Sequence, residues 1–219
     1  RERTVSRGLG DVYKRQMIKR LLKNVEGIER LRLSSVDPSE IDEDLLDLIA
    51  NEKRLMPSLH LSVQAGNDLI LKRMKRRHLR DDVIKLSTLL LEIRPDIVLG
   101  ADLIAGFPTE TDEMFKQTID LISDAELLHL HIFPYSARTG TPAAKMPQVT
   151  SKIKKMRARL LREAGAELVA EHLSKRVGRI ETVLLEQNDT GYTDQFFPMK
   201  VYGNHQAGEI VTAKVDNVM

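Results

Sequence analysis

The segment ADLIAGFPTETDEMF (residues 101–115) sets the fold class, because it reads as a buried strand, a Gly-Phe-Pro turn and the acidic start of a helix. Thr109 is predicted to cap that helix. In α/β proteins, ligands bind in the loops that follow the C-terminal ends of parallel strands. The segment therefore predicts an α/β fold with a site for a nucleotide-like ligand at this junction.

Three more strands of this kind are predicted, and helices separate them. The four predicted strands cover residues 29–35, 58–66, 96–108 and 127–136. Asp37 follows the first strand as a predicted N-cap, with Pro38 and Glu40 in the first helical turn. One long helix is predicted over residues 68–92. Strands separated by helices form parallel sheets through right-handed crossovers, so a parallel sheet is expected.

Three of the four predicted strands have one apolar and one polar face, and the third strand adds Asp102. The polar positions are Arg32, Ser34, His60, Ser62, Gln64, Asp102, His129 and His131. A polar face shared by consecutive strands predicts a barrel lumen that holds a polar ligand; the alternative is a sheet with one wet face. The three histidines are interpreted as hydrogen-bonded lumen residues, since no acidic cluster with ligand spacing accompanies them. No metal site is predicted.

Charge and composition narrow the class of protein. The net charge is only +2, but residues 72–80 and residues 152–162 each carry six Lys or Arg side chains. Each basic segment is a candidate nucleic-acid surface or an ordinary solvated face. The sequence contains no cysteine, which excludes disulfides and thiolate ligands from this chain. No apolar run is long enough to span a membrane, so a cytoplasmic protein with no membrane partner is expected.

Three segments are distinguished along the chain. Residues 1–16 are interpreted as an extraneous or disordered tail and are left out of the fold prediction. Residues 17–176 contain the strand–helix units and end in a basic helix over 150–176. Residues 177–219 contain short β-like runs broken by Asn, Asp and Gly, which predict a small β-barrel domain.

Four sequence blocks carry a family resemblance: LRLSSVDP, HLSVQAGNDLILKRMKRRH, ADLIAGFPTET and HLHIFPYSARTGTPAAKMPQV. In this order and spacing they resemble the radical S-adenosylmethionine tRNA methylthiotransferases, over about residues 17–219. The second and fourth blocks look most like the branch that acts on threonylcarbamoyladenosine in tRNA. The relatives in that family act on isopentenyladenosine in tRNA or on a ribosomal protein.

The resemblance implies a fold and an activity. The fold is a partial radical-SAM (β/α) barrel, here its last four strand–helix units, followed by a TRAM-like β-barrel that binds tRNA. The activity is addition of a methylthio group to the adenine ring at tRNA position 37, in the anticodon stem-loop. It uses S-adenosylmethionine and two 4Fe-4S clusters.

The chain departs from the family pattern in its lack of cysteine, so neither cluster can be ligated as the family does it. The resemblance therefore indicates a fragment without the N-terminal part of the enzyme, with a naturally truncated protein as the alternative. The chain itself is expected to be inactive. An exposed edge of the incomplete sheet is expected to cause self-association.

Site residues are carried over from the resemblance. Those expected near S-adenosylmethionine are Ser34, Ser35, Gln64, Gly66, Asp102, Gly106, Glu110, Phe133 and Tyr135. The two glycines could equally serve turns, and Glu110 could equally be a favourable charge at a helix start. Those expected to contact RNA are Arg73, Arg76, Arg77, Arg138, Lys154 and Lys155.

Two other functions remain open from the sequence. One is a stand-alone RNA-binding module, in which Tyr192, Phe196, Phe197 and Tyr202 stack on bases, although a core role is expected for at least two of these rings. The other is a cofactor-independent barrel enzyme such as an aldolase. That reading has little support because none of the inward strand positions is a lysine.

Overall fold

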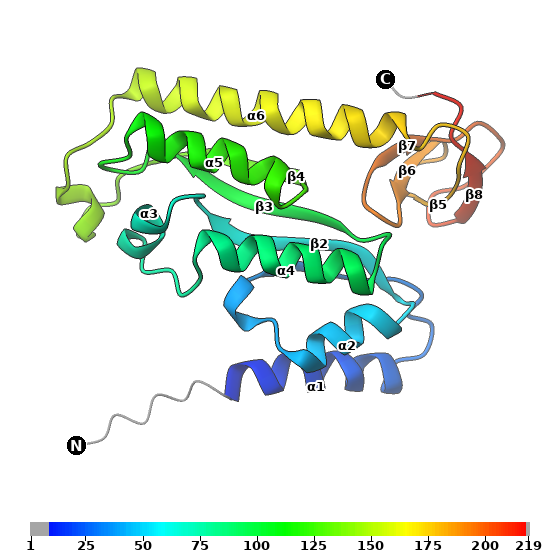
Figure 1. Cartoon of the computed structure of the whole chain (residues 1–219). Coiled ribbons are helices and arrows are strands. Elements are labelled where there is room, and N and C mark those ends of the chain that lie inside the picture. The colour runs from blue at the N-terminus through cyan, green and yellow to red at the C-terminus, as the bar shows by residue number, and fades with distance from the viewer. Residues whose placement is uncertain (1–8, 218–219) are drawn as a thin grey trace.

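The computed structural model describes residues 9–217, and its larger part is a parallel sheet covered by helices (Figure 1). The strands are β1 (Leu31–Val36), β2 (Leu55–Gln64), β3 (Val98–Ala105) and β4 (Leu127–Pro134). They are hydrogen-bonded in the order β1-β2-β3-β4, and each neighbouring pair is parallel. The predicted parallel α/β sheet is therefore confirmed.

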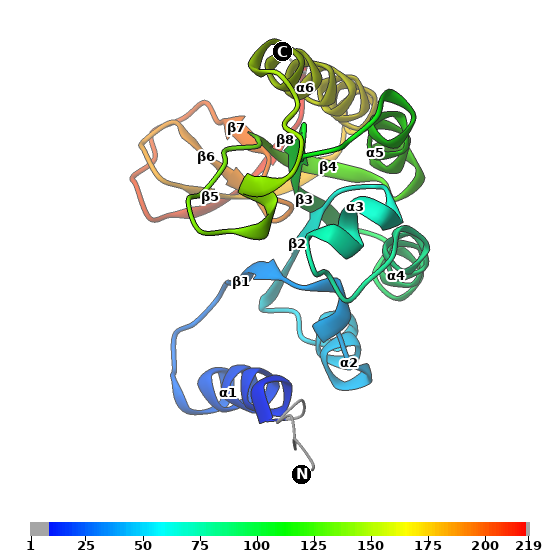
Figure 2. The same ribbon diagram turned by 90° about the vertical axis from the view of Figure 1, so that its left-hand side faces the viewer.

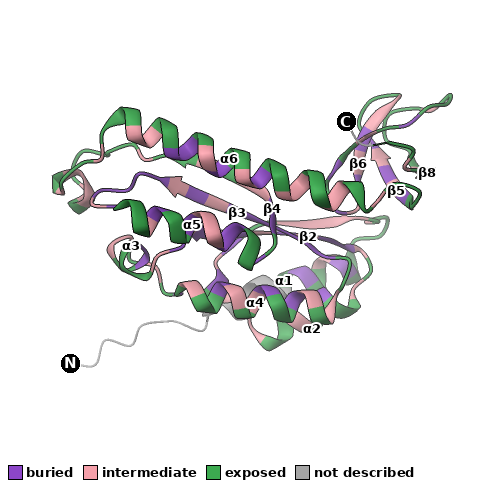
Figure 3. Cartoon of the chain, turned by 45° about the horizontal axis from the view of Figure 1, so that its top comes forward, coloured by how far each residue is buried: buried purple, intermediate pink, exposed green. Residues whose placement is uncertain are grey.

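The helices lie on one side of this sheet (Figure 2). They are α2 (Glu43–Asn51), α3 (Asp68–Arg73), α4 (Arg80–Ile93), α5 (Asp112–Asp124) and α6 (Ser151–Ser174). Burial alternates along β2, where Leu59, Leu61 and Val63 are buried and the residues between them are half-buried. Figure 3 shows the buried positions gathered on the strands and on the inner sides of the helices. Alternation thus directs one strand face to the helices and leaves the other as the predicted lumen.

Two of the predicted helix starts, at Asp37 and Thr109, are wrong in detail. Asp37 caps a short 3-10 helix, η1 (Pro38–Glu40), and Asp42 caps α2 by accepting a hydrogen bond from Leu45 N at 2.8 Å. Thr111 caps α5, whereas Thr109 lies in the left-handed region with φ of 67°. An N-cap residue needs extended backbone angles, which Thr109 does not have.

The helix predicted over residues 68–92 is two helices. Lys75 has φ of 59°, so the helical path ends after α3. The connection then buries His78, whose Nε2 lies 3.0 Å from Val63 O. A long-range contact with β2 therefore decides this break, and the local sequence pattern does not carry that information.

Helix α1 (Leu9–Asn24) precedes the sheet. Residues 1–8 of the predicted tail lie outside the described residues, but residues 9–16 form the first part of α1, so they are helical. The extraneous origin of residues 1–16 stays a prediction. Among the described residues, every helix is too short or too polar to cross a membrane.

The C-terminal part forms a second sheet. Its strands are β5 (Ile180–Leu185), β6 (Thr190–Thr193), β7 (Pro198–Lys200) and β8 (Ile210–Lys214), paired antiparallel in the order β7-β6-β5-β8. The outer strands β7 and β8 do not pair within residues 9–217, so this is a four-stranded sheet, and the predicted barrel closure is not confirmed.

The β6–β7 connection joins this second sheet to the first. Phe197 is buried against Val98 and Leu128 of the parallel sheet. Arg32 donates hydrogen bonds to the carbonyl oxygens of Asp194 and Thr193, at 2.7 and 2.8 Å. These contacts fix the C-terminal sheet near the N-terminal halves of β1, β3 and β4.

Candidate ligand site in the lumen

A cavity of about 430 Å³ lies on the polar face of the parallel sheet. Its volume is typical of sites for small molecules. Strands β1 to β4 and the β6–β7 connection contribute the lining. The polar and aromatic lining residues are Arg32, Ser34, Ser58, His60, His129, His131 and Phe196. The predicted lumen face therefore forms a concave surface, and the C-terminal sheet closes one side of it.

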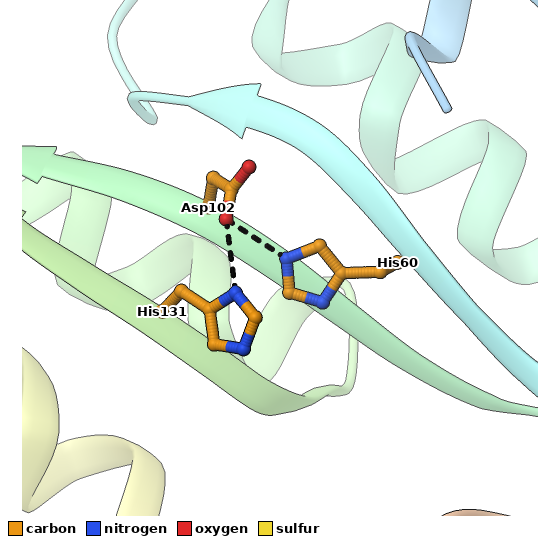
Figure 4. A group of neighbouring side chains, drawn as sticks. All are labelled: His60, Asp102 and His131. Atoms are coloured by element: carbon orange, nitrogen blue, oxygen red, sulfur yellow. Dashed lines mark hydrogen bonds and ion pairs between the residues drawn. The ribbon is translucent and has the colours of Figure 1, made fainter. Parts of the chain in front are cut away.

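Asp102 joins two of the histidines (Figure 4). Its Oδ1 lies 3.0 Å from His60 Nε2 and 3.2 Å from His131 Nδ1. The two rings are 4.3 Å apart between centroids. Because a carboxylate only accepts hydrogen bonds, it places a proton on each of these two nitrogens. The hydrogen-bonded state predicted for these histidines is seen here.

The same three side chains could hold a metal ion, since one ligand atom from each lies within 4.8 Å of the others. The sequence interpretation overlooked Asp102 as the acidic partner of the histidines. Strand alternation places all three residues on one face, but the parallel register sets Asp102 beside His131 and places His60 beside Gly100. The sequence does not specify that register.

Gly100 makes room for the histidines. A Cβ at this position would lie 2.5 Å from His129 O and 2.6 Å from His60 Nδ1. The first of these atoms is backbone and cannot move aside cheaply. Gly100 is therefore a lining residue that sequence reasoning missed, and its signal was a glycine inside a strand.

Burial and positive charge characterise this cavity. Burial lowers the pKa of His129, and the positive charges of neighbouring lining residues lower it further. Its Nε2 donates to Gln195 O at 2.8 Å, so the neutral ring joins the two sheets. Burial also lowers the pKa of Arg32, whose guanidinium lies 4.9 Å from the centre of the Phe196 ring.

Unusual backbone angles gather at the C-terminal ends of β2 and β3. Gln64 ends β2 with φ of 77°, and Gly106 follows β3 with φ of 72°. A non-glycine residue in the left-handed region is uncommon and often marks a functional site. Nearby on the lumen face, Ser35 and Ser62 share a hydrogen bond of 2.8 Å between their hydroxyls. These residues form the second candidate region, called here the strand-end edge.

Two residues predicted for S-adenosylmethionine have structural roles at this edge. Gly66 packs against α5, because a Cβ there would lie 2.5 Å from Gln117 O. Glu110 is buried, accepts from Gly106 N at 2.9 Å and pairs with Arg157 at 2.7 Å. Burial raises the pKa of Glu110, against the opposing effect of Arg157. Close packing against α5 therefore explains the glycine at position 66, and the contacts with Gly106 and Arg157 explain the buried carboxylate of Glu110.

The two aromatic residues predicted near the ligand, Phe133 and Tyr135, differ in their surroundings. Phe133 is 52% exposed and lies edge-on to His131. Tyr135 instead packs edge-on against Phe107, with Lys154 Nζ 4.9 Å from its ring centre. Phe133 remains available to a ligand, whereas Tyr135 and Lys154 contact each other.

The other predicted RNA contacts differ in their partners. Arg73 donates to Thr109 Oγ1, Arg76 pairs with Asp37 at 3.4 Å, and Arg77 pairs with Glu40 at 3.0 Å. Within the described part of the chain, no ion pair involves Arg138 or Lys155, and both residues are exposed. The structure brings the first three near η1 and the strand-end edge, away from the lumen cavity.

The residues present can be tested against the cofactors of the resemblance. The chain has no cysteine, so the thiolates that would hold an iron–sulfur cluster are not among its residues. The hydroxyls of Ser34 and Ser35 and the amide of Gln64 suit the polar groups of S-adenosylmethionine. Of the nine predicted residues, those exposed or half-buried and open to such a ligand are Ser34, Ser35, Gln64, Asp102 and Phe133, whereas Gly106 is buried beside Lys154.

Comparison with known proteins identifies a family and several relatives of this chain. Residues 7–122 match the model of the Radical SAM superfamily. The chain is 50% identical over 200 residues to a threonylcarbamoyladenosine tRNA methylthiotransferase of Rickettsia prowazekii, covering 91% of the chain and 48% of that protein. It is 36% identical to the tRNA-2-methylthio-N(6)-dimethylallyladenosine synthase of Orientia tsutsugamushi (strain Boryong), covering 87% of the chain and 44% of that protein.

A solved structure supports the fold. Coproporphyrinogen III oxidase (HemN) from Escherichia coli, a radical SAM enzyme, matches with a TM-score of 0.56 and 24% identity, over 73% of this chain and 37% of that one. The chain spans about half the length of the curated relatives it matches.

Proposed function

Because this chain belongs to the radical SAM superfamily, we propose that it is the C-terminal part of a tRNA methylthiotransferase. The observation that carries this proposal is the 50% identity over 200 residues to the Rickettsia threonylcarbamoyladenosine tRNA methylthiotransferase. The proposed reaction adds a methylthio group to the adenine ring of threonylcarbamoyladenosine at tRNA position 37. When bound, S-adenosylmethionine and its cluster supply the radical that activates the ring.

The strand-end edge is the proposed place for S-adenosylmethionine. Ser35 and Gln64 offer a hydroxyl and an amide, and the backbone of Gln64 is left-handed with φ of 77°. Phe133 offers an exposed aromatic face to a base. The target nucleoside is proposed to lie beside S-adenosylmethionine at the same edge, since ligands of barrel enzymes lie toward the C-terminal ends of the strands.

The anticodon stem-loop is the proposed RNA partner. Arg138 and Lys155 lie exposed near this edge and are suited to phosphate contacts.

We propose further that the 219-residue chain alone is inactive, because it holds no cysteine for a cluster. Self-association through the open edge of β1 is proposed as well, and light scattering of the purified chain tests it.

A chimera tests the proposed reaction. The N-terminal half of the Rickettsia relative is joined to this chain at the matching position and expressed in cells that lack their own tRNA methylthiotransferases. Mass spectrometry of the tRNA nucleosides is expected to show the methylthio derivative of threonylcarbamoyladenosine. A methylthio derivative of dimethylallyladenosine alone would assign the chain to the other group of relatives.

A stand-alone RNA-binding module is the second candidate function. It is favoured by Tyr202, which is 83% exposed, and by Phe196, which stacks on Tyr192 at 4.6 Å between ring centres. Aromatic faces of this kind bind unpaired bases. The module predicts tight binding of the stem-loop with or without S-adenosylmethionine and no product from the chimera.

A further inference from the structure

We propose that His60, Asp102 and His131 form a site for one divalent transition-metal ion in the lumen. The proposal goes beyond the proposed function, since it concerns a single ion held by this chain's own side chains. The three residues come from the neighbouring strands β2, β3 and β4, and their side chains point toward one another on the polar face of the sheet (Figure 4). Side chains carried by strands keep their spacing, which favours a preformed site.

The spacing of the three side chains suits a shared metal ion. Asp102 Oδ1 lies 3.0 Å from His60 Nε2 and 3.2 Å from His131 Nδ1. Donor atoms about 2.1 Å from one ion lie about 3.0–3.4 Å apart at right-angled or tetrahedral coordination. One ligand atom from each residue lies within 4.8 Å of the others. A small rotation of the exposed His131 ring therefore completes the set.

The two rings can release the nitrogens that face Asp102. Each neutral ring carries its proton on the nitrogen that bonds the carboxylate, but an imidazole can carry it on the other nitrogen instead. Within residues 9–217, neither His60 Nδ1 nor His131 Nε2 makes a hydrogen bond. The proton can therefore move to that nitrogen without a change in the charge of the ring. The nitrogen facing Asp102 then offers its lone pair to a metal ion.

The donor types indicate the class of ion. Two imidazole nitrogens and a carboxylate oxygen suit ions such as Zn²⁺, Co²⁺ and Ni²⁺, whereas Mg²⁺ and Ca²⁺ prefer oxygen donors alone. Three protein ligands leave at least one coordination position open, unlike the closed set of a structural zinc site. His60 and His131 line the cavity of about 430 Å³, so a ligand in that cavity can supply the remaining donor.

Burial and charge around the site are compatible with a cation. The side chains of His60 and Asp102 are 15% and 23% exposed, and that of His131 is 63% exposed, which leaves a path for an ion. Arg32 also lines the cavity and opposes a cation, but main-chain carbonyl oxygens hold both of its terminal nitrogens. The ring of His129 adds no charge, because burial lowers its pKa. The carboxylate of Asp102 therefore faces the incoming ion.

Titration of the tag-free 219-residue chain with Co²⁺ tests the site. Visible absorption follows the bound ion, because its ligand field depends on the donor atoms and their geometry. One Co²⁺ per chain is expected, and neither Mg²⁺ nor Ca²⁺ should displace it. Absence of stoichiometric binding at millimolar Co²⁺, or displacement by Mg²⁺, would overturn the proposal.

Substitutions locate the bound ion. Asp102→Asn and His131→Phe are each expected to weaken Co²⁺ binding by at least about 100-fold, since even groups that only orient a metal ligand contribute about 10–100-fold. His131→Phe changes a side chain that is 63% exposed, so the variant is expected to fold. His205→Gln is the control, because His205 lies in the C-terminal part and pairs with Glu209 at 3.6 Å. Undiminished binding by the first two variants would place the ion elsewhere and overturn the proposal.

X-ray absorption spectroscopy of the Zn²⁺-loaded chain gives a measurement that needs no variant. Two imidazole nitrogens and oxygen donors at about 2.0–2.2 Å are expected. A shell with one imidazole or none contradicts the site. These experiments use neither tRNA nor S-adenosylmethionine, whereas the chimera is judged by its nucleoside product. Failure of the metal site and failure of the proposed function are therefore distinguishable.

Discussion

At the strand-end edge, the protein itself engages most of the polar side chains, whereas in the lumen cavity the same strands leave polar groups open. Glu110 at the edge is enclosed by Arg157 and the Gly106 amide. His60 and His131 in the lumen each keep one nitrogen without a protein partner among the described residues. Loops need polar side chains to satisfy their own backbone, and strand pairing does not. Polar residues on an inward strand face are therefore better ligand candidates than polar residues in the loops.

The largest expected effect comes from breaking the Glu110–Arg157 pair. Both side chains are at most 3% exposed, so Arg157→Ala would leave a carboxylate buried without its partner. Loss of one member of a buried pair costs about 3–5 kcal/mol of the free energy of unfolding. Urea denaturation followed by circular dichroism measures it.

Arg159→Ala is the matched control on the same helix, because Arg159 is exposed and pairs with Glu163 at 3.7 Å. Its expected cost is below about 0.5 kcal/mol. Equal effects of the two substitutions would mean that Glu110 is not held for structure, and its assignment to a ligand would return.

Two glycine substitutions sharpen the comparison next. Gly66→Ala brings a Cβ within 2.5 Å of a main-chain oxygen of α5, and overpacking of this kind costs about 1–3 kcal/mol. Gly165→Ala meets only the methyl end of Leu130, and the better helix propensity of alanine offsets part of that contact. Thermal denaturation of both variants should show a clear loss for Gly66→Ala alone; similar melting temperatures would contradict the packing role.

A smaller effect is expected from pH at the junction of the two sheets. His129 and His172 flank Phe197, at 4.6 and 5.4 Å between ring centres. Burial lowers the pKa of both histidines, and the positive charges of Arg32 and the basic residues 175–179 contribute. The unfolded chain therefore binds more protons as pH falls below about 6.5.

The free energy of unfolding is thus expected to be highest above that pH. It should decrease as pH falls toward the lowered pKa values of the two histidines in the folded protein. Melting temperatures measured between about pH 7.5 and pH 5.5 check the direction. His172→Gln should flatten the pH dependence, while His205→Gln should leave it unchanged. A melting temperature that rises on acidification would show that the sign is wrong.

The smallest effect on stability is expected for the exposed basic residues. Lys155→Ala should change the free energy of unfolding by less than about 0.5 kcal/mol. It should weaken binding of the anticodon stem-loop and reduce the slope of log affinity against log salt by about 1 if Lys155 contacts a phosphate. Lys85→Ala, at an exposed position of α4, is the control and should change neither quantity.

The fold class was predictable because it depends on local periodicity. The alternation of LHLSVQ and the segment ADLIAGFP required only the spacing of apolar residues to predict parallel strands. The break at His78 and the cap at Thr111 were not predictable in this way. The break depends on a hydrogen bond to Val63 in another strand, and the cap on the backbone angles of the loop.

In the candidate site, too, local sequence predicts some features and only long-range contacts decide the others. Residue types and strand alternation alone put His60, Asp102 and His131 on one inward face, so the polar lumen is a property of the sequence. Only the tertiary structure set these side chains 3.0–3.2 Å apart, placed Phe196 over Arg32 and turned Glu110 toward Arg157. Those contacts join residues far apart in the chain, and they depend on strand register and helix docking, which no local pattern encodes.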